Sequence, residues 1–474
     1  MLTYDFNNRG NTSLYEYLYR CIKRDILSGK LKAKEKLPSK RTLAVHLKIS
    51  VVTIENSYAQ LLSEGYIYSV EKKGYYVSSL EEQIPMVQTQ KKKLSIPDTK
   101  KVDFFIDFRT NSIHASNFPF TTWLKLMREV LSEHNEELLM APPYNGVPKL
   151  RNAIADYLYS FRGMNVSPDQ IIIGAGTEYL YGLLIQLLGR ENVFAVENPG
   201  YKKVADIYRS YNAKCEFINM DAAGLSINHL KSSLATVVHI SPSHHFPTGI
   251  IMPIKRRQEL LHWANKSAKR YIIEDDYDSE FRFTGRPIQT LQSIDTNQKV
   301  IYMNTFSKSI APSIRISYMI LPTHLMDKYK QTMSFYSNTV PTFDQHALAK
   351  FIANGYFEQH INRMRNFYKK QRDLVINAIK NSPLWEKVTI HEENAGLHFL
   401  MKVATNMDDS FLKEAAVKEG IRLSCLSEYY HTNEKQTEHT IVINYSGIDG
   451  SRIHEAIERL SRIFNTNSSY KHIL

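Results

Sequence analysis

The sequence is poor in cysteine and has no long apolar segment. Its three cysteines, Cys21, Cys215 and Cys425, lie far apart, so their spacing fits neither a disulfide framework nor a zinc site and is typical of a reducing cytosol. No run of about 18 apolar residues indicates a membrane-spanning helix. The first residues, MLTYDFNNRGN, lack the apolar region of a secretory signal peptide. We therefore expect a cytoplasmic protein with no membrane contact and no metal centre.

The chain is long and carries an excess of positive charge. Its 474 residues suggest roughly two to four domains, and its 43% hydrophobic and 23% charged residues exclude wholesale disorder and collagen-like repeats. The net charge is +12, and residues 1–80, with 13 basic and 7 acidic residues, hold half of that excess. A basic segment favours a polyanionic partner but also fits a solvated surface, so the residue pattern must decide.

The first eighty residues predict short helices followed by a hairpin. Ser13 and Glu16 have the spacing of a capping box, and Ser39 precedes a second helical pattern as an N-cap. Lys48-Ile49-Ser50 interrupts the pattern before a third helix, and a basic turn joins two strand-like runs. The predicted elements are helices over residues 14–28, 40–47 and 52–63 and strands over residues 66–70 and 75–77.

A three-residue turn between two short helices is typical of a helix-turn-helix. In that arrangement the helix after the turn lies in the major groove of DNA, and the basic hairpin tip meets the phosphate backbone as a wing. A small helical domain with a hairpin and no role on DNA is the structural alternative.

This segment resembles the winged helix-turn-helix of GntR-type bacterial repressors, through LPSKRTLAVHL, an S-x-x-T pattern, LLSEGYIY and KKGYYV. The resemblance implies a DNA-binding domain over residues 11–78, with double-stranded operator DNA as the partner. It assigns DNA contacts to Ser39, Arg41, Thr53, Lys72, Lys73 and Gly74. The family usually has an arginine directly after the turn serine, and this chain has Val51 there, so we expect a changed affinity or operator choice.

The chain then continues into a linker and a large second region. Residues 79–104 predict an extended linker, because charged residues, glutamine and two prolines dominate and glycine is absent. From about residue 105, short apolar runs alternate with amphipathic helical patterns. The runs are rich in valine and isoleucine, which suits strands buried on both faces of a mostly parallel sheet. They cover residues 171–173, 193–196, 236–240, 271–273 and 300–303.

Polar residues follow these runs where a ligand would bind, since open α/β sheets hold ligands beyond the carboxyl ends of their strands. The chain has a glycine turn, two tyrosines, an aspartate and a lysine at these positions. Each of them alone has another reading: the glycines as a tight turn, the aspartate as a cap or a solvated acid, and the lysine as a surface charge. Five such groups at strand ends together indicate a binding site.

These residue types suit pyridoxal 5'-phosphate (PLP). The amine of Lys308 can form a Schiff base with the aldehyde, and Asp275 can keep the pyridine nitrogen protonated. Tyr277 can donate to the ring phenolate, and Tyr201 can stack on the ring. The phosphate needs backbone N–H groups at a helix start and a cation. The candidates for the phosphate are Gly176, Thr177, Thr305, Ser307 and Arg315.

The region resembles fold-type I aminotransferases, through YNGVPKLR, IIIGAGTE, ENPGY, SPSHHFPTG, IIEDDYDSEF and NTFSKSIAPSIR. The resemblance implies an α/β fold over residues 105–465, with a mostly parallel large-domain sheet, a small α+β domain, PLP as cofactor and the residue roles given above. The enzymes usually carry an asparagine before the Pro-Thr-Gly sequence. Phe246 stands there in this chain, which removes one polar candidate near the ring.

The two halves together are similar to the MocR (GabR-like) regulators. This resemblance implies a homodimer, with each DNA-binding domain resting against the partner's large domain, and a change in DNA binding when PLP or an amine adduct occupies the site. Many members carry a late arginine for a substrate carboxylate where this chain has Gly447, and the GABA-sensing type has an arginine where it has Lys203. Because neither residue replaces a bidentate arginine, we expect poor binding of simple α-amino acids and at most weak transamination. The effector is then PLP itself, slightly favoured, or an amine whose acidic group docks on Lys203 or Arg452.

Three functions remain open at this stage. The favoured one is a transcription regulator that senses PLP or an adduct of it. The second is a working aminotransferase with an accessory DNA-binding domain, although an enzyme has no need of a basic wing. The third is a DNA-binding protein whose large domain is only a dimerisation scaffold, which would not require the set Lys308, Asp275, Tyr277 and Arg315.

Overall fold

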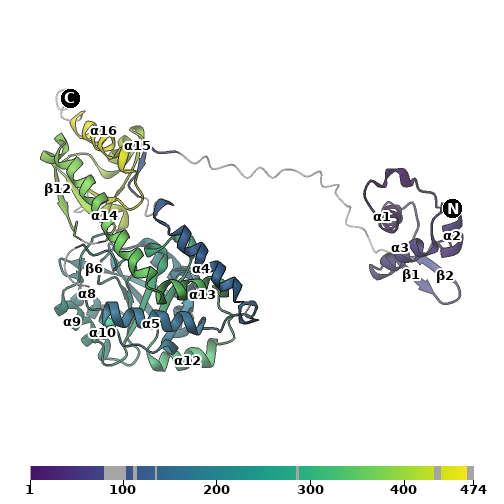
Figure 1. Ribbon diagram of the computed structural model, residues 1–474, viewed down its shortest axis with the longest axis horizontal. Coiled ribbons are helices and arrows are strands. Elements are labelled where there is room, and N and C mark those ends of the chain that lie inside the picture. The colour runs from purple at the N-terminus through teal and green to yellow at the C-terminus, as the bar shows by residue number, and fades with distance from the viewer. Residues whose placement is uncertain are drawn as a thin grey trace. The chain divides into compact units, whose positions relative to one another are not determined.

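The computed structural model describes residues 2–79, 103–109, 115–133, 136–283, 288–394, 396–431 and 439–466. The chain forms two compact units, residues 1–100 and residues 101–474 (Figure 1). Most of the linker predicted over residues 79–104 lies outside the described residues. Within the described part of the chain, no helix combines the length and the apolar character needed to cross a membrane.

The N-terminal unit consists of three helices and a two-stranded antiparallel hairpin. Its elements are the 3-10 helix η1 (Phe6–Arg9), α1 (Leu14–Leu27), α2 (Lys40–Leu47), α3 (Val51–Ser63), β1 (Ile67–Val70) and β2 (Gly74–Val77). One apolar core joins them and includes Leu18, Ile22, Leu43, Tyr58 and Leu61. The predicted helix-turn-helix and hairpin are confirmed, with boundaries that differ by one residue.

Serine side chains fix where α2 and α3 begin. The hydroxyl of Ser39 accepts a hydrogen bond from the backbone N–H of Thr42 at 3.2 Å, as predicted. The hydroxyl of Ser50 accepts from the N–H of Thr53 at 3.1 Å. Because an N-cap serine satisfies a donor that the helix leaves open, α3 begins at Val51, one residue earlier than predicted.

The capping box predicted at Ser13 and Glu16 is not formed. Ser13 precedes α1, but its side chain makes no capping hydrogen bond. Glu16 instead accepts from Arg20, one turn further along α1, at 2.5 Å. A charged pair at this spacing on a helix competes with the cap for the same carboxylate.

The large unit is built on an eight-stranded sheet with the order β4-β11-β10-β9-β8-β5-β6-β7. β4, β11 and β10 pair antiparallel, as do β6 and β7, and the other neighbours are parallel. The strands are β4 (Ile171–Gly174), β5 (Val193–Asn198), β6 (Lys214–Asp221), β7 (Gly224–Leu225), β8 (Val237–Ile240), β9 (Tyr271–Asp275), β10 (Val300–Thr305) and β11 (Ser317–Ile320). All five predicted strands are present, and the mostly parallel sheet is confirmed.

Helices cover both faces of this sheet (Figure 1). Ile172, Phe194 and Ile273 pack on one side with α6, α7 and α12, and their neighbours Ile171 and Ile272 pack on the other side. Burial on both faces explains why these strands do not alternate in polarity. The helices of this part are α4 (Phe120–Ser132), α5 (Pro148–Arg162), α6 (Thr177–Leu188), α7 (Lys202–Ser210), α8 (Ile227–Ser232), α9 (Ile254–Asn265), α10 (Leu291–Ile294), α11 (Phe306–Ser309), α12 (Thr323–Met333) and α13 (Thr342–Ala353).

The carboxyl-terminal part forms the small α+β domain that the resemblance implied. It has an antiparallel sheet with the order β12-β13-β16-β15. Its elements are α14 (Tyr356–Lys380), β12 (Val388–His391), β13 (His398–Val403), α15 (Asp409–Lys418), β14 (Ile421–Arg422), β15 (Ser424–Cys425), β16 (Thr440–Asn444) and α16 (Ile453–Thr466). β14 pairs in parallel with β3 (Ile106–Asp107), so residues from the start of the large unit lie beside this domain.

Candidate cofactor and DNA-binding sites

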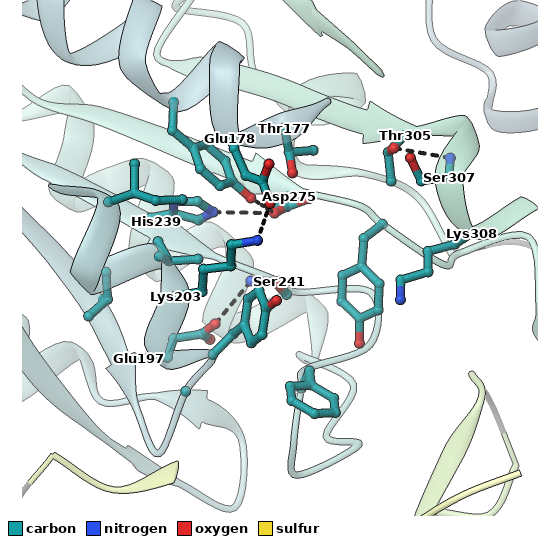
Figure 2. Close-up of a pocket in the computed structure, with 18 of the residues that line it drawn as sticks. Thr177, Glu178, Glu197, Lys203, His239, Ser241, Asp275, Thr305, Ser307 and Lys308 are labelled. Carbon is teal, nitrogen blue, oxygen red and sulfur yellow. Dashed lines mark hydrogen bonds and ion pairs between the residues drawn. The ribbon is translucent and has the colours of Figure 1, made fainter. Parts of the chain in front are cut away.

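A cavity of about 530 Å³ lies at the carboxyl ends of the central strands. Residues that follow β5, β8, β9 and β10 line it, together with the start of α6 and with Tyr429 from the 3-10 helix η7 (Leu426–Tyr429). The residues that line it include Thr177, Tyr201, Asp275, Tyr277, Thr305, Ser307, Lys308 and Arg315. Figure 2 labels five of these, namely Thr177, Asp275, Thr305, Ser307 and Lys308. Gly176 stands directly before α6 as its N-cap. The structure therefore brings the predicted cofactor residues to one place.

The carboxylate of Asp275 is held from one side only. It ends β9, and only 7% of the residue is exposed. Its Oδ2 accepts a hydrogen bond from the hydroxyl of Tyr181 at 2.5 Å and lies 3.5 Å from Nε2 of His239 (Figure 2). Its Oδ1 is buried and has no hydrogen-bond partner among the described residues. Since buried polar atoms are nearly always paired, this oxygen can accept from a donor placed in the cavity, such as a pyridinium N–H.

His239 is itself fixed by a tyrosine behind it. Its Nδ1 lies 2.6 Å from the hydroxyl of Tyr208, which is fully buried. A chain of contacts therefore leads from the buried Tyr208 through His239 to Asp275 at the cavity. It holds the carboxylate in one orientation.

Lys308 projects into the cavity from the short helix α11 (Figure 2). Burial lowers the pKa of its amine to about 8, against a weaker opposing effect of the Asp278 carboxylate. An amine must be unprotonated to attack a carbonyl. A buried lysine with this pKa is suited to bind an aldehyde near neutral pH.

Tyrosine and phenylalanine rings form the remaining walls. Burial raises the pKa of Tyr277 well above its ordinary value, so its hydroxyl keeps its proton and can donate. The ring of Tyr201 lies edge-on to Phe246, with 5.9 Å between the ring centroids. Phe246 also packs edge-on against Tyr429 at 5.2 Å. Phe246 thus contributes an apolar surface at the position where the enzymes usually have an amide.

The start of α6 is shaped for an anion. Gly176 has φ +93°, and a Cβ atom there would lie 2.2 Å from Nη2 of Arg315. Only glycine therefore lets the guanidinium approach the helix N-terminus, where free N–H groups favour negative charge. Nearby, Ser307 has a buried hydroxyl with no described partner, and the hydroxyl of Thr305 accepts from the N–H of Ser307 at 3.1 Å.

The predicted DNA-contacting residues occupy the surface of the N-terminal unit. Ser39 and Arg41 are exposed at the start of α2, and Thr53 lies in the first turn of α3. Lys72 and Lys73 are exposed in the turn of the hairpin, and Gly74 opens β2 with φ +111°. Val51, at the position where the family usually has arginine, is 42% exposed, so it leaves an apolar spot at the amino end of α3.

Comparison with known proteins identifies both units. The family model "Bacterial regulatory proteins, gntR family" matches residues 14–77, and "Aminotransferase class I and II" matches residues 105–460. The chain is 38% identical to the HTH-type transcriptional regulator YdeL of Bacillus subtilis over 94% of this chain and 96% of YdeL. It is 31% identical to the probable rhizopine catabolism regulatory protein MocR of Rhizobium meliloti over 95% and 94% of the two chains. The chain belongs to the MocR group of GntR-type transcriptional regulators.

The predicted family and fold class are thereby confirmed. The chain is also 27% identical to the pyridoxine biosynthesis transcriptional regulator PdxR of Corynebacterium glutamicum over 88% and 89% of the two chains. Among solved structures, the multiple substrate aminotransferase of Thermococcus profundus matches 78% of this chain and 93% of its own, with 26% identity and a TM-score of 0.67. This MocR-type regulator therefore joins a DNA-binding unit to a unit with the fold of a class I/II aminotransferase.

The two effector candidates of the regulator are not placed alike. Lys203 lines the cavity, but its ammonium group contacts the carboxylate of Glu178. Arg452 does not line the cavity: its Nη1 donates to the backbone oxygen of Phe105 at 3.1 Å, and its Nε lies 3.6 Å from Asp449. The turn that carries Arg452 directs it to these partners, and a contact between Arg452 and an effector stays a prediction. Gly447 does not line the cavity either.

Several cavity residues of the regulator were not predicted. Tyr181 lies four residues after Thr177, so helical spacing could have indicated it, and His239 is the one polar residue of the run 237–240. Glu178, Arg109 and Glu197 gave no such signal. Among the cations that line the cavity, Arg109 and Lys308 make no ion pair with a described residue.

Glu197 and His245 form a buried pair in the cavity wall of the regulator. Burial raises the pKa of Glu197 to about 8 and lowers the pKa of His245 to about 3. The His245 Nε2 atom lies 3.4 Å from Oε2 of Glu197, which accepts from the N–H of Ser241 at 3.0 Å. Both effects disfavour the charged forms, so this wall presents neutral hydrogen-bonding groups at neutral pH.

Proposed function

We propose that this regulator binds operator DNA through its winged helix as a homodimer and carries PLP on Lys308. In this proposal PLP, or an amine adduct of it, changes the affinity of the dimer for DNA. The observation that supports this most is that the buried Oδ1 of Asp275 has no hydrogen-bond partner among the described residues and that Asp275 lines the same cavity as Lys308. As a regulator of transcription, the protein acts in the cytoplasm.

The described residues fit PLP at each of its groups. Asp275 would accept from the ring nitrogen, Tyr277 would donate to the ring phenolate, and Tyr201 would cover one face of the ring. The phosphate would be held by Gly176, Thr177, Thr305, Ser307 and Arg315. Bound there, PLP supplies an aldehyde that condenses with amines. Lys308 supplies the amine that holds it, and the carboxylate of Asp275 holds a proton at the ring nitrogen.

PLP itself is the favoured effector. The name of PdxR, a regulator of pyridoxine biosynthesis, supports this choice by relation. Lys203 pairs with Glu178 and Arg452 lies elsewhere, so neither is free to clamp the acidic group of an amino acid. Such a group would instead meet Arg109 at the cavity wall. The arginines that line the cavity are Arg109 and Arg315, and Arg315 is the candidate for the phosphate. Because only Arg109 is then left for a carboxylate, we expect poor binding of simple α-amino acids and at most weak transamination.

Two other functions are weaker. An aminotransferase with an accessory DNA-binding domain would not need the exposed Arg41 and the basic turn at Lys72 and Lys73. A DNA-binding protein with a mere scaffold would not need a buried lysine in the same cavity as a buried carboxylate whose Oδ1 has no partner among the described residues, because such groups destabilise a fold unless a ligand uses them.

The test of the proposal uses the full chain. An operator duplex is first selected from a randomised DNA library, and DNA binding is then measured with and without PLP. We expect the protein to take up PLP with a visible absorbance band that Lys308→Ala abolishes and the exposed-lysine control Lys369→Ala retains. We also expect PLP to change the DNA affinity of the parent chain but not that of Lys308→Ala. A colourless protein that takes up no PLP would overturn the proposal, as would a duplex affinity that PLP leaves unchanged.

A further inference from the structure

The carboxylate of Glu178 lies between two cations at the start of α6. Its Oε2 accepts a hydrogen bond from Nη2 of Arg315 at 2.8 Å. Its Oε1 contacts the ammonium group of Lys203, which comes from the first turn of α7 (Figure 2). All three residues line the cavity. One acidic side chain thus bridges the cation assigned to the phosphate of PLP and a neighbouring lysine.

Arg315 places its guanidinium at the start of α6. Its backbone is in the left-handed region, with φ +50°, which is uncommon for a side chain other than glycine or asparagine. Its Nη2 lies against Gly176, so close that a Cβ atom there would collide with it. The guanidinium therefore lies at the helix N-terminus, and any phosphate that binds there meets an arginine already in contact with the carboxylate of Glu178.

Glu178 keeps its negative charge in this cluster. The hydrogen bond from Lys203 lowers the pKa of the carboxyl group, with further contributions from the positive charges of Lys203 and Arg315. A carboxylate and a phosphate dianion beside the same guanidinium repel each other, and solvent weakens that repulsion here because the side chains of Arg315 and Glu178 are 48% and 39% exposed. Lys203 offsets part of it, because it stays paired with Glu178.

We propose that Glu178 is an intramolecular competitor for the phosphate subsite of PLP, which lowers the affinity of the regulator for PLP. Bound phosphate takes Arg315 from Glu178, and Lys203 then neutralises the released carboxylate. The consequence is a site that fills and empties with the supply of PLP, as a sensor requires, rather than one that holds its cofactor permanently. This inference rests on the proposed function and assigns Lys203 to Glu178 instead of to an effector.

The decisive variant is Glu178→Gln, which keeps the shape of the side chain and removes its charge. The affinity of the full chain for PLP is measured by absorbance titration, and its affinity for inorganic phosphate by calorimetry. We expect Glu178→Gln to bind both about two- to fivefold more tightly, the range usual for an exposed ion pair. Pyridoxal, which lacks the phosphate, should bind equally well to the variant and to the parent. Glu458→Gln removes the same charge from an exposed site on α16 and should change neither affinity.

A second variant tests the role of Lys203. Lys203→Met should weaken PLP binding in the parent chain, because Glu178 then stays unneutralised, and should have little effect in Glu178→Gln. Unchanged or weaker PLP binding in Glu178→Gln would overturn the inference while the proposed function stands, and so would an equal gain for pyridoxal. Failure of the parent and of both variants to take up PLP would overturn the proposed function and this inference with it.

Discussion

At the scale of single residues, burial decides which side chains can react. Lys308 is buried at the cavity, so its amine loses hydration and its pKa falls to about 8. An exposed lysine keeps a pKa of about 10.4. Because of this difference, Lys308 can be largely unprotonated in mildly alkaline solution, whereas an exposed lysine stays protonated. The reaction with an aldehyde is therefore directed by the environment of the lysine and not by its residue type.

The rate of PLP uptake should follow this pKa. The neutral amine is the reactive form, so a lowered pKa moves the rise of the rate to lower pH. Between pH 7 and pH 9 we expect about a tenfold increase, with a midpoint near pH 8 and a plateau above it. Stopped-flow absorbance over this range measures it, with Lys369→Ala as the control. A midpoint near pH 10 would show that another lysine reacts.

Buried and exposed ion pairs should differ sharply in their contribution to stability. Arg162 and Asp276 form a pair with side chains 2% and 0% exposed. Removal of one partner leaves the other charge buried without a counter-charge. Arg162→Ala should therefore lower the free energy of unfolding by about 3–5 kcal/mol. Arg209→Ala breaks an exposed pair with Asp206 and should cost less than about 1 kcal/mol. Urea unfolding followed by tryptophan fluorescence reports the large unit, because Trp123, Trp263 and Trp385 all lie there. Equal midpoints for the two variants would contradict the expectation.

At the scale of elements, the sequence predicted the strands that have a local residue pattern. It did not predict strand direction or contacts between residues far apart in the chain. Runs such as 271–273 predicted strands because burial on both faces selects valine and isoleucine. β11 (Ser317–Ile320) returns antiparallel after the short connection from β10, and nothing local distinguishes a return from a crossover. The same holds in the site: Arg315 follows Lys308 closely and could be predicted, whereas its contact with Glu178 joins residues 137 positions apart. Arg109 was likewise not predicted, because it lies far in sequence from the other residues that line the cavity.

Residues of the helix-turn-helix should contribute to DNA affinity without contributing to PLP binding. Arg41 is exposed on α2 and makes no ion pair with a described residue. If it contacts DNA, Arg41→Ala should weaken binding and reduce the slope of log affinity against log salt by about 1, because one phosphate contact releases about one counterion. The visible absorbance of bound PLP should not change. Arg20→Ala, on α1 and paired with Glu16, is the control. Loss of the PLP band in Arg41→Ala would mean that the two units are assigned wrongly.

At the scale of the whole molecule, regulation requires a coupling free energy between PLP binding in one unit and DNA binding in the other. PLP can alter DNA binding only if it binds one arrangement of the regulator better than another. Linkage then makes the effect reciprocal: the factor by which PLP changes the DNA affinity equals the factor by which DNA changes the PLP affinity. This equality holds whichever sign the regulation has, so it tests the coupling without any knowledge of the regulated genes.

Two titrations of the full chain measure both factors. Fluorescence anisotropy with the selected operator gives the DNA affinity at zero and at saturating PLP, and absorbance titration gives the PLP affinity with and without that duplex. We expect the two ratios to agree and to lie in the range of roughly 5- to 150-fold that is usual for coupled sites. Glu178→Gln provides an internal check, because a change confined to the cofactor site should leave the apo DNA affinity intact and shift only the PLP concentration at which the response occurs. Two ratios of one, with PLP and DNA both bound, would mean that the large unit does not regulate DNA binding. The function would then have to be sought in the chemistry of the cavity alone.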